Sequence, residues 1–297
     1  MSGRVAVSLA QIDIATLDPA RNRARMAEIA EAEARAGAGL VVFPELATTG
    51  YVEPMAPGLA APGGFADWAA RFLACTETAG GETVTALGAI AARHGMRIVL
   101  GMALRDPAVR GRVTNSSVLI GPAGLEAVYH KLHLWQNEKL FFAPGDRLPV
   151  VDAGLGGLGM QVCYDIRFPE ITRALTLTGA RVITNVWASF RPSDTPAADP
   201  AHFRHRAFTR AQENGVFFLS CNRVGVQGGH RFMGHSVVCG PDGQVLAEAA
   251  HENEAVLRAE LDLAAVDGYR SFVGLLNDRR PALYGALVAP LAGIPES

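Results

Sequence analysis

The chain has 297 residues, 49% of them hydrophobic and 19% charged, which is typical of a folded globular protein and excludes a disordered or fibrous one. Its 27 basic and 29 acidic residues give a formal net charge of −2, so no overall positive field attracts nucleic acid or anionic lipid. No segment approaches the roughly 20 apolar residues that cross a bilayer, and we therefore expect a cytoplasmic protein that binds neither nucleic acid nor membranes.

The first half of the chain alternates strand patterns with amphipathic helical patterns. Asp18-Pro19 supplies an N-cap and a first-turn proline for one helix, and Gly37 and Gly39 end it. The run 40–43 is apolar throughout, which indicates a strand covered on both faces. In chain order the predicted elements are a strand at 4–14, a helix at 19–36, a strand at 40–43, a helix at 83–94, and strands at 97–104, 115–120 and 125–129.

The second half repeats this alternation and adds a hairpin. Pro241-Asp242-Gly243 has the residue types of a tight turn between two short strands. The predicted elements are strands at 157–162, 181–186, 216–221, 236–239 and 244–248, and helices at 169–178 and 199–214. Helices that alternate with strands predict an α/β protein with a mixed sheet system, in a single domain with a looser tail after about Val266.

The cysteines and histidines do not indicate a disulfide framework or a metal site. The four cysteines lie far apart and form no CxxC pair; they are Cys75, Cys163, Cys221 and Cys239. This favours reduced thiols, and the ordinary role of each is that of a small buried apolar residue. His202 and His205 lie one helical turn apart, but no third ligand accompanies them, so we expect helix-surface residues and no metal.

Three predicted strands end in residues that can do chemistry or bind a ligand, namely Glu45, Cys163 and Trp187. Ligands of open α/β sheets gather beyond the carboxyl ends of the strands, so these residues could face one pocket. Glu45 is costly to bury without a partner or a task, although it could simply cap a loop. Cys163 precedes a helix that begins near Pro169, whose dipole favours the thiolate, but a structural cysteine is the ordinary alternative.

Lys131 is the third residue of interest, in the segment Tyr-His-Lys-Leu-His-Leu after a predicted hairpin strand. A loop lysine is usually solvated. Leu132 and Leu134 weaken that interpretation, because they indicate a partly covered segment.

Taken together, these segments resemble the carbon–nitrogen hydrolase (nitrilase) superfamily, whose members use a Glu-Lys-Cys triad. The matching segments are Val-Val-Phe-Pro-Glu45-Leu, His-Lys131-Leu-His-Leu, Val-Cys163-Tyr-Asp-Ile-Arg-Phe-Pro-Glu, Phe141-Phe142-Ala-Pro-Gly145-Asp, Arg210-Ala-Gln-Glu213-Asn214 and Gly234-His-Ser-Val-Val-Cys-Gly-Pro-Asp-Gly243. The resemblance runs from about residue 4 to 260. It implies a four-layer αββα sandwich over residues 1–265, a C-terminal tail over 266–297 at an oligomer interface, and a homodimer or larger assembly.

The resemblance also implies roles for single residues in a site that needs no cofactor. Glu45 would be the general base and proton shuttle, Lys131 an oxyanion donor, and Cys163 the nucleophile. The backbone N–H of Tyr164 would be the second oxyanion donor. Glu138 would position the substrate or orient Lys131, although it could also be a surface carboxylate. Two aromatic residues are substrate-pocket candidates, Trp187 and, more weakly, Tyr51; core packing is the alternative for Trp187.

The tripeptide at the nucleophile favours an amide substrate. True nitrilases of this superfamily typically carry Cys-Trp-Glu, whereas this chain has Cys163-Tyr164-Asp165, which looks like the amidase and carbamoylase branches. An N-carbamoyl hydrolase is the first alternative and a nitrilase the second. An inactive binding protein of the same fold and a papain-like cysteine–histidine hydrolase that uses His130 or His133 are the alternatives from other classes.

Overall fold

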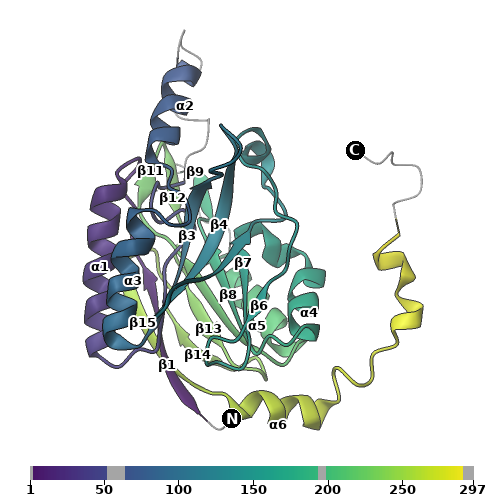
Figure 1. Cartoon of the computed structure of the whole chain (residues 1–297). Helices are drawn as coiled ribbons and strands as arrows, with labels where there is room; N and C mark the ends of the chain where they lie inside the picture. Colours follow the sequence, from purple (N-terminus) through teal and green to yellow (C-terminus); the bar gives the residue numbers. More distant parts are fainter. Residues whose placement is uncertain (1–2, 52–63, 193–198, 290–297) are drawn as a thin grey trace.

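Two six-stranded sheets form the centre of the computed structural model, which describes residues 3–51, 64–192 and 199–289 (Figure 1). The first sheet has the order β15-β1-β2-β3-β4-β5, with bounds Ala255–Asp262, Arg4–Gln11, Leu40–Val42, Arg97–Arg105, Val113–Gly121 and Gly124–His130. The second has the order β14-β13-β10-β8-β7-β6, with bounds Val245–Glu248, Val237–Cys239, Phe217–Asn222, Val182–Trp187, Leu158–Val162 and Val150–Val151. A small third sheet consists of β11 (Val226–Gln227), β12 (His230–Phe232) and β9 (Phe190–Pro192).

The sheets pack face to face, and helices cover their outer faces. Leu9 and Val99 of the first sheet share one buried apolar cluster with Met160 and Leu219 of the second. Helices α1 (Pro19–Arg35) and α3 (Glu82–His94) cover the first sheet, and α4 (Pro169–Leu177) and α5 (Ala201–Gln212) cover the second (Figure 1). This arrangement confirms the predicted four-layer αββα sandwich, in which each sheet buries both faces.

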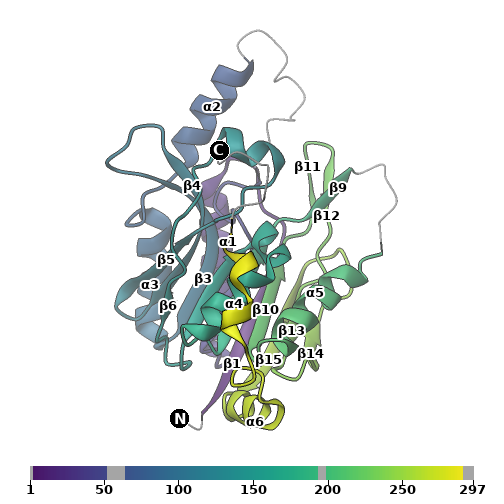
Figure 2. The ribbon, with the colours of Figure 1, turned by 90° about the vertical axis from the view of Figure 1, so that its right-hand side faces the viewer.

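Several elements of the structure were not predicted from the sequence. The longest are α2 (Gly64–Cys75), β15 and α6 (Ala264–Val273), and the short strands β6, β9, β11 and β12 were also missed. Strand β15 pairs antiparallel with β1 along its whole length. The predicted boundary between residues 265 and 266 lies inside α6, where Val266 is fully buried and Arg270 donates to the carbonyls of Ala180 (2.8 Å) and Gly215 (3.0 Å). Figure 2, which faces the α4 and α5 layer, shows the chain continuing beyond α6.

The first strand is also shorter than predicted. It ends at Gln11 rather than at residue 14, because Asp13 forms only an isolated bridge with Val224. Among the described residues, no helix combines the length and the apolar character needed to cross a membrane.

The strand directions place the ends of four strands at one edge of the sandwich. β1, β2 and β3 are parallel, and β5 runs in the same direction as β3 because each pairs antiparallel with β4. In the second sheet, β7, β8 and β10 are parallel. Carboxyl ends of parallel strands meet at one edge of a sheet, and here the residues that follow β2, β5, β7 and β8 include the predicted site residues.

Candidate active site

Glu45 lies in a tight turn just after β2. Its backbone N–H donates to the carbonyl of Trp187 at the end of β8 (3.2 Å), which ties the two sheets together at this edge. The neighbouring strand β3 approaches the turn at Gly101, whose N–H donates to the carbonyl of Pro44 (3.0 Å). A Cβ atom at Gly101 would overlap the Cα of Glu45 and lie 2.7 Å from the nitrogen of Leu46. The missing side chain is therefore what allows Glu45 to sit here.

Lys131 follows β5 and is held on both sides by backbone hydrogen bonds. Its N–H donates to the carbonyl of Asn115 in β4 (2.8 Å), and its own carbonyl accepts from Gly145 (2.9 Å). A Cβ atom at Gly145 would overlap the carbonyl oxygen of His130, so this close crossing also needs glycine. The Lys131 side chain is fully buried, contrary to the usual fate of a loop lysine.

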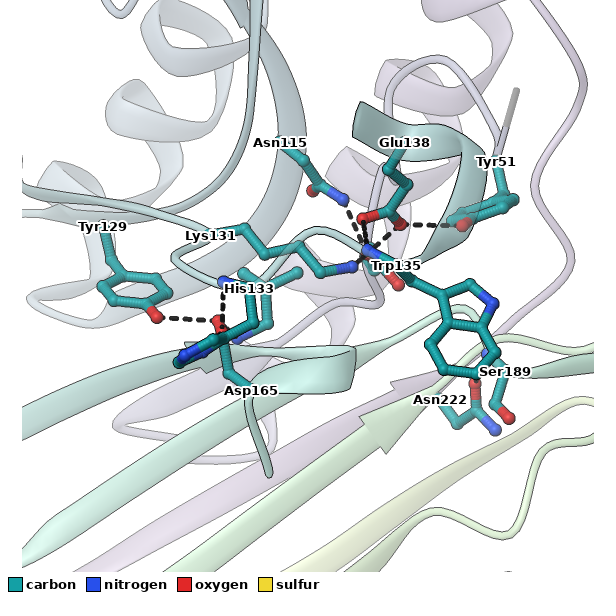
Figure 3. A network of polar contacts seen from close by, with 12 residues as sticks. Tyr51, Asn115, Tyr129, Lys131, His133, Trp135, Glu138, Asp165, Ser189 and Asn222 are labelled. Atoms are coloured by element: carbon teal, nitrogen blue, oxygen red, sulfur yellow. Dashed lines mark hydrogen bonds and ion pairs between the residues drawn. The ribbon is translucent and has the colours of Figure 1, made fainter. Parts of the chain in front are cut away.

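A buried charge cluster joins three of the predicted residues. Lys131 Nζ donates to Glu45 Oε1 (2.8 Å) and to Glu138 Oε1 (2.8 Å). Figure 3 shows Lys131 and Glu138 pointing toward each other. All three side chains are buried, with exposed fractions of 0 to 2%. One ammonium thus lies between two carboxylates, and the cluster has a formal charge of −1. Moving these three charges out of water costs free energy, and the attraction between the ammonium and the two carboxylates recovers only part of that cost.

Glu138 lies in the 3-10 helix η1 (Gln136–Leu140) and is held by further donors. Tyr51 Oη donates to Glu138 Oε1 (2.7 Å), and the backbone N–H of Trp135 donates to Glu138 Oε2 (2.9 Å). Both contacts are drawn in Figure 3. The surface-carboxylate alternative for Glu138 is therefore wrong, because the side chain is buried and fully engaged.

Asn115 is a residue of this cluster that the sequence analysis did not single out. Its Nδ2 donates to Glu45 Oε1 (2.6 Å), the same oxygen that accepts from Lys131. The second carboxylate oxygen, Glu45 Oε2, is buried and has no hydrogen-bond partner among the described residues. The signal in the sequence was the polar run Thr-Asn-Ser-Ser in β4, a strand that is buried along its whole length.

Cys163 occupies a strained turn at the end of β7. It begins the 3-10 helix η2 (Cys163–Arg167) with a positive φ of 48°, a conformation that is uncommon for a residue other than glycine. The fully buried Asp165 fixes this turn. It accepts from Tyr129 Oη (2.7 Å) and from the N–H groups of His133 (2.9 Å) and Val162 (3.3 Å), and part of this network appears in Figure 3.

Burial shifts the pKa of each central group. Burial raises the pKa of Glu45, because the opposing charge of Lys131 offsets only part of the desolvation. Burial alone lowers the pKa of Lys131, but the charges of Glu45 and Glu138 outweigh it, so that pKa is raised well above its ordinary value. Burial, followed by the charge of Glu45, raises the pKa of Cys163 well above that of a free thiol. The direction of this shift is opposite to the expected preference for the thiolate, because desolvation disfavours the charged sulfur.

A cavity of about 250 Å³ opens beside Cys163. Its lining residues are Tyr51, Trp135, Gln136, Cys163, Tyr164, Arg167, Trp187, Ala188, Ser189 and Phe190. The predicted pocket residues Tyr51, Tyr164 and Trp187 all lie in this lining, whereas Glu45 and Lys131 are buried behind it. Among the described residues, three larger hollows of about 820, 660 and 290 Å³ lie elsewhere, and none is lined by Glu45, Lys131, Cys163 or the predicted substrate-binding residues. Chemistry rather than size therefore selects the smaller cavity.

The remaining predicted residues lie around this site. Trp187 is almost fully buried, and its ring packs against Phe203 (centroids 5.1 Å apart), so it lines the cavity and also packs in the core. His205 is exposed as expected, but His202 is half-buried, because its ring packs against Phe203 at 4.0 Å. From the sequence we also predict that Arg191 and the loop 192–200 shape the entrance; residues 193–198 of that loop lie outside the described residues.

Comparison with known proteins identifies the class to which this fold and site belong. Residues 6–271 match the family described as carbon-nitrogen hydrolase, and the chain belongs to that family. It is a hydrolase of the nitrilase superfamily, amidase branch, that acts on carbon–nitrogen bonds other than peptide bonds. This confirms the predicted family and reaction class.

Individual relatives cover almost the whole chain. It is 34% identical to a nitrilase of Pyrococcus abyssi over 94% of this chain and 99% of that protein. It is 32% identical to a 2-oxoglutaramate amidase of Bacillus subtilis, over 94% of this chain and 98% of that protein. The structure of an amidase from Nesterenkonia sp. superposes with a TM-score of 0.75 at 28% identity, covering 95% and 96%. A glutamate-to-glutamine mutant of that amidase carries the acetamide moiety of fluoroacetamide covalently at its active-site cysteine.

Proposed function

We propose that this enzyme hydrolyses a small carboxamide to a carboxylic acid and ammonia through a thioester on Cys163. The observation that carries the proposal is the state of Glu45. One of its oxygens is held by Lys131 and Asn115, while the other is buried, has no hydrogen-bond partner in the described part of the chain and is available to a proton. The chain's similarity to amidases and the covalent cysteine adduct of the Nesterenkonia amidase support the same chemistry.

The first half of the proposed reaction forms the thioester. Glu45 accepts the thiol proton of Cys163, and the sulfur attacks the amide carbonyl carbon. Lys131 Nζ and the backbone N–H of Tyr164 stabilise the resulting oxyanion, and a single donor of this kind contributes about 3–4 kcal/mol to the transition state. Glu45 then gives its proton to the nitrogen, the carbon–nitrogen bond breaks, and ammonia leaves.

The second half releases the acid. Glu45, again a carboxylate, accepts a proton from a water molecule that attacks the thioester carbonyl. The carbon–sulfur bond breaks, the proton returns to the sulfur of Cys163, and the carboxylic acid departs. The raised pKa of Glu45 suits both directions of proton transfer near neutral pH. Glu138 and Tyr51 act in this scheme by fixing Lys131 between two carboxylates.

The proposal is tested by measuring ammonia release from a panel of carboxamides, N-carbamoyl compounds and nitriles. Wild-type protein should release ammonia and acid from a carboxamide, and Cys163→Ala should abolish this. Cys75→Ala is the matched control, because Cys75 is also partly exposed but lies outside the cavity. Carbon dioxide with the ammonia would identify a carbamoyl hydrolase instead. Full activity of Cys163→Ala would overturn the mechanism.

Thiol alkylation tests the role of Glu45 separately. Cys163 should react faster than the partly exposed Cys75, and far faster than Cys221 and Cys239, which are buried; burial raises the pKa of Cys239 to about 12. Glu45 acts on this thiol in two opposite ways, as a base and as a charge that raises its pKa. We expect the reaction of Cys163 to slow in Glu45→Gln, because the loss of the base should outweigh the loss of the charge. Equal reaction of all four thiols would favour an inactive binding protein.

We further propose a cytoplasmic homodimer or larger homo-oligomer in which residues 266–297 contribute to the interface. All four cysteines are free, as expected for a reducing compartment. Several large apolar side chains of the C-terminal region are exposed, among them Phe272 (89%) and Val288 (87%), together with Leu283 and Leu287. Clustered exposed apolar residues are typical of a surface that a protein partner covers.

A further inference from the structure

Arg223 is a fully buried cation that no step of the proposed reaction uses. It follows β10 directly, and its backbone N–H donates to the carbonyl of Trp187 (3.3 Å), the same carbonyl that accepts from the N–H of Glu45. Its guanidinium carbon lies 3.8 Å from the centroid of the Phe232 ring in β12. A buried cation is costly unless it is paired or has a task, so the partners of this side chain indicate its role.

The guanidinium of Arg223 joins the segment after β1 to the small third sheet. Its Nη2 donates to Asp13 Oδ1 (3.0 Å) and to the carbonyl of Ile14 (2.9 Å), and its Nη1 donates to Gln227 Oε1 in β11 (2.9 Å). A guanidinium can only donate hydrogen bonds. The oxygen of the Gln227 amide must therefore face Arg223, and its nitrogen must face away, so Arg223 fixes the orientation of this amide.

Gln227 continues the path of hydrogen bonds to the active site. Its Nε2 donates to the backbone carbonyl of Tyr51. Tyr51 Oη in turn donates to Glu138 Oε1 (2.7 Å), the oxygen that also accepts from Lys131 Nζ, as Figure 3 shows. An unbroken series of contacts, through one backbone carbonyl and three side chains, therefore connects Arg223 to the ammonium group at the centre of the site.

The charge of Arg223 also acts on Glu45. Burial lowers the pKa of Arg223 to about 10, and the charges of Asp13 and then Glu45 oppose that shift, so Arg223 stays a cation at neutral pH. The Asp13 side chain is 54% exposed, so solvent screens its charge. Glu45 lies instead in a fully buried cluster with Lys131 and Glu138, whose formal charge is −1. Arg223 therefore adds a second positive charge that stabilises ionised Glu45.

We propose that Arg223 is a positioning residue of the active site: it holds the Glu138 carboxylate in place through this path of hydrogen bonds, and its fixed charge favours the ionised form of Glu45. The inference rests on the proposed role of Glu45 as the base. Arg223 is not among the described residues that line the cavity beside Cys163, so its removal should affect turnover more than substrate binding.

The first test removes the guanidinium. Arg223→Gln should lower kcat about 10- to 100-fold and change KM less than about threefold, because displaced catalytic groups slow the chemistry while the cavity remains. Loss of the positive charge should raise the pKa of Glu45 further, so the acid limb of kcat/KM should move to higher pH. Arg223→Lys keeps the charge but loses the planar set of donors, so it should keep the acid limb near its wild-type position and still lower kcat.

A second variant separates the hydrogen bonds from the charge. Gln227→Met breaks the link to Tyr51 and leaves Arg223 in place, so kcat should fall while the acid limb stays where it is. Arg97→Gln is the matched control. Arg97 begins β3, at the end of the sheet away from the site, where it is 24% exposed and pairs with Glu126 (2.8 Å). That variant should keep the wild-type kcat and acid limb.

The pKa of Glu45 can also be measured without turnover, by NMR titration of protein that carries carbon-13 at the glutamate carboxyl groups. The Glu45 signal is the one that Glu45→Gln lacks, and its pKa should be higher in Arg223→Gln than in the wild type. If Arg223→Gln keeps the wild-type kcat and the wild-type Glu45 pKa, Arg223 only supports the fold and the proposal is overturned.

The remaining outcomes separate this proposal from the proposed function. A wild-type protein that hydrolyses no amide overturns the proposed function, while the NMR titration still decides whether the charge of Arg223 acts on Glu45. If Arg223→Gln does not fold, Gln227→Met and Arg223→Lys decide the question: wild-type kcat in both of these variants overturns the positioning role.

Discussion

Two buried glutamates of the first sheet layer show how differently the same side chain can be used. Glu33 of α1 accepts hydrogen bonds at both oxygens: Arg258 donates to each (2.6 and 2.7 Å), and Ser8 Oγ adds a third (2.8 Å). These bonds, those of Arg258 first, lower the pKa of Glu33. Glu45 is buried more deeply, one of its oxygens has no hydrogen-bond partner among the described residues, and burial raises its pKa.

The difference separates a structural carboxylate from one that is suited to proton transfer. Glu33 gives up its hydration for a full set of charge-assisted hydrogen bonds, so its ionised form is stabilised and it has little tendency to accept a proton. Glu45 loses its hydration but gains hydrogen bonds at only one of its oxygens, so its protonated and ionised forms are closer in free energy. Two differences therefore distinguish them: Glu45 lies deeper in the protein and beside a second carboxylate, and its set of hydrogen bonds is incomplete.

The largest effect should come from removing the central ammonium. Lys131→Met leaves Glu45 and Glu138 buried without a counter-charge, so we expect loss of turnover together with a decrease of about 3–5 kcal/mol in the free energy of unfolding. Arg258→Met is the control at the other carboxylate. Its side chain is 64% exposed and therefore screened, so the cost should be about 1 kcal/mol with activity retained. Urea unfolding measures the stability of both variants, and ammonia release measures their activity. Equal losses of stability in the two variants would contradict the distinction between Glu45 and Glu33.

The second test exchanges each carboxylate for its amide. Glu45→Gln removes the base and should lower kcat about 10²- to 10⁴-fold while changing the free energy of unfolding little. Glu33→Gln should do the reverse: it loses charge-assisted bonds from Arg258, costs about 1–2 kcal/mol of stability, and leaves kcat unchanged. If Glu45→Gln turned over substrate at the wild-type rate, the distinction drawn between the two glutamates would be lost.

A smaller effect on stability and kcat is expected from disturbing the backbone that holds Glu45. Gly101→Ala places a Cβ against the backbone of Glu45 and Leu46, so we expect about 1–3 kcal/mol of destabilisation and a lower kcat from a displaced carboxylate. Gly88→Ala in α3 is the matched control, because its Cβ would meet only Ile120, at an ordinary 3.7 Å. That variant should gain up to about 1 kcal/mol from helix propensity and keep full activity. Thermal unfolding and steady-state kinetics of both variants provide the check.

The pH dependence should report the raised pKa of Glu45. A base is lost as the pH falls through its pKa, so the acid limb of kcat/KM should lie above the ordinary glutamate value of about 4.3. The charge of Glu138 contributes to that rise, after burial, so Glu138→Gln should move the limb to lower pH. A limb at the ordinary value in wild-type enzyme would show that Glu45 is not the titrating base.

The smallest effect on chemistry is expected from the C-terminal region. Deleting residues 274–297 removes the exposed Leu283, Leu287 and Val288, so the assembly should dissociate toward smaller species while the site residues remain in place. Light scattering coupled to size-exclusion chromatography measures the mass. Deleting 290–297 alone is the matched control and should leave the mass per assembly nearly unchanged. An unchanged oligomer after the longer deletion would contradict the proposed interface.

Local pattern determined much of this protein. The alternation of apolar runs with amphipathic segments predicted most helices and strands, because burial on one or two faces imposes a short period on the chain. Strand ends drew attention to Glu45, Cys163 and Trp187, since an apolar strand that stops at a reactive residue is a local feature. The weaker patterns of β15 and α6 were missed, although β15 pairs with β1 along its length and α6 is anchored by Val266 and Arg270.

Only the tertiary structure decided which hydrogen-bond and charge partners these residues have. Asn115 meets Glu45 across 70 residues of sequence, Lys131 meets Glu45 across 86, and Tyr129 meets Asp165 across 36. No local period encodes which oxygen of Glu45 has no hydrogen-bond partner among the described residues. Hydrogen-bond partners and pKa shifts depend on groups that only chain folding brings together, because desolvation and charge act through space rather than along the chain.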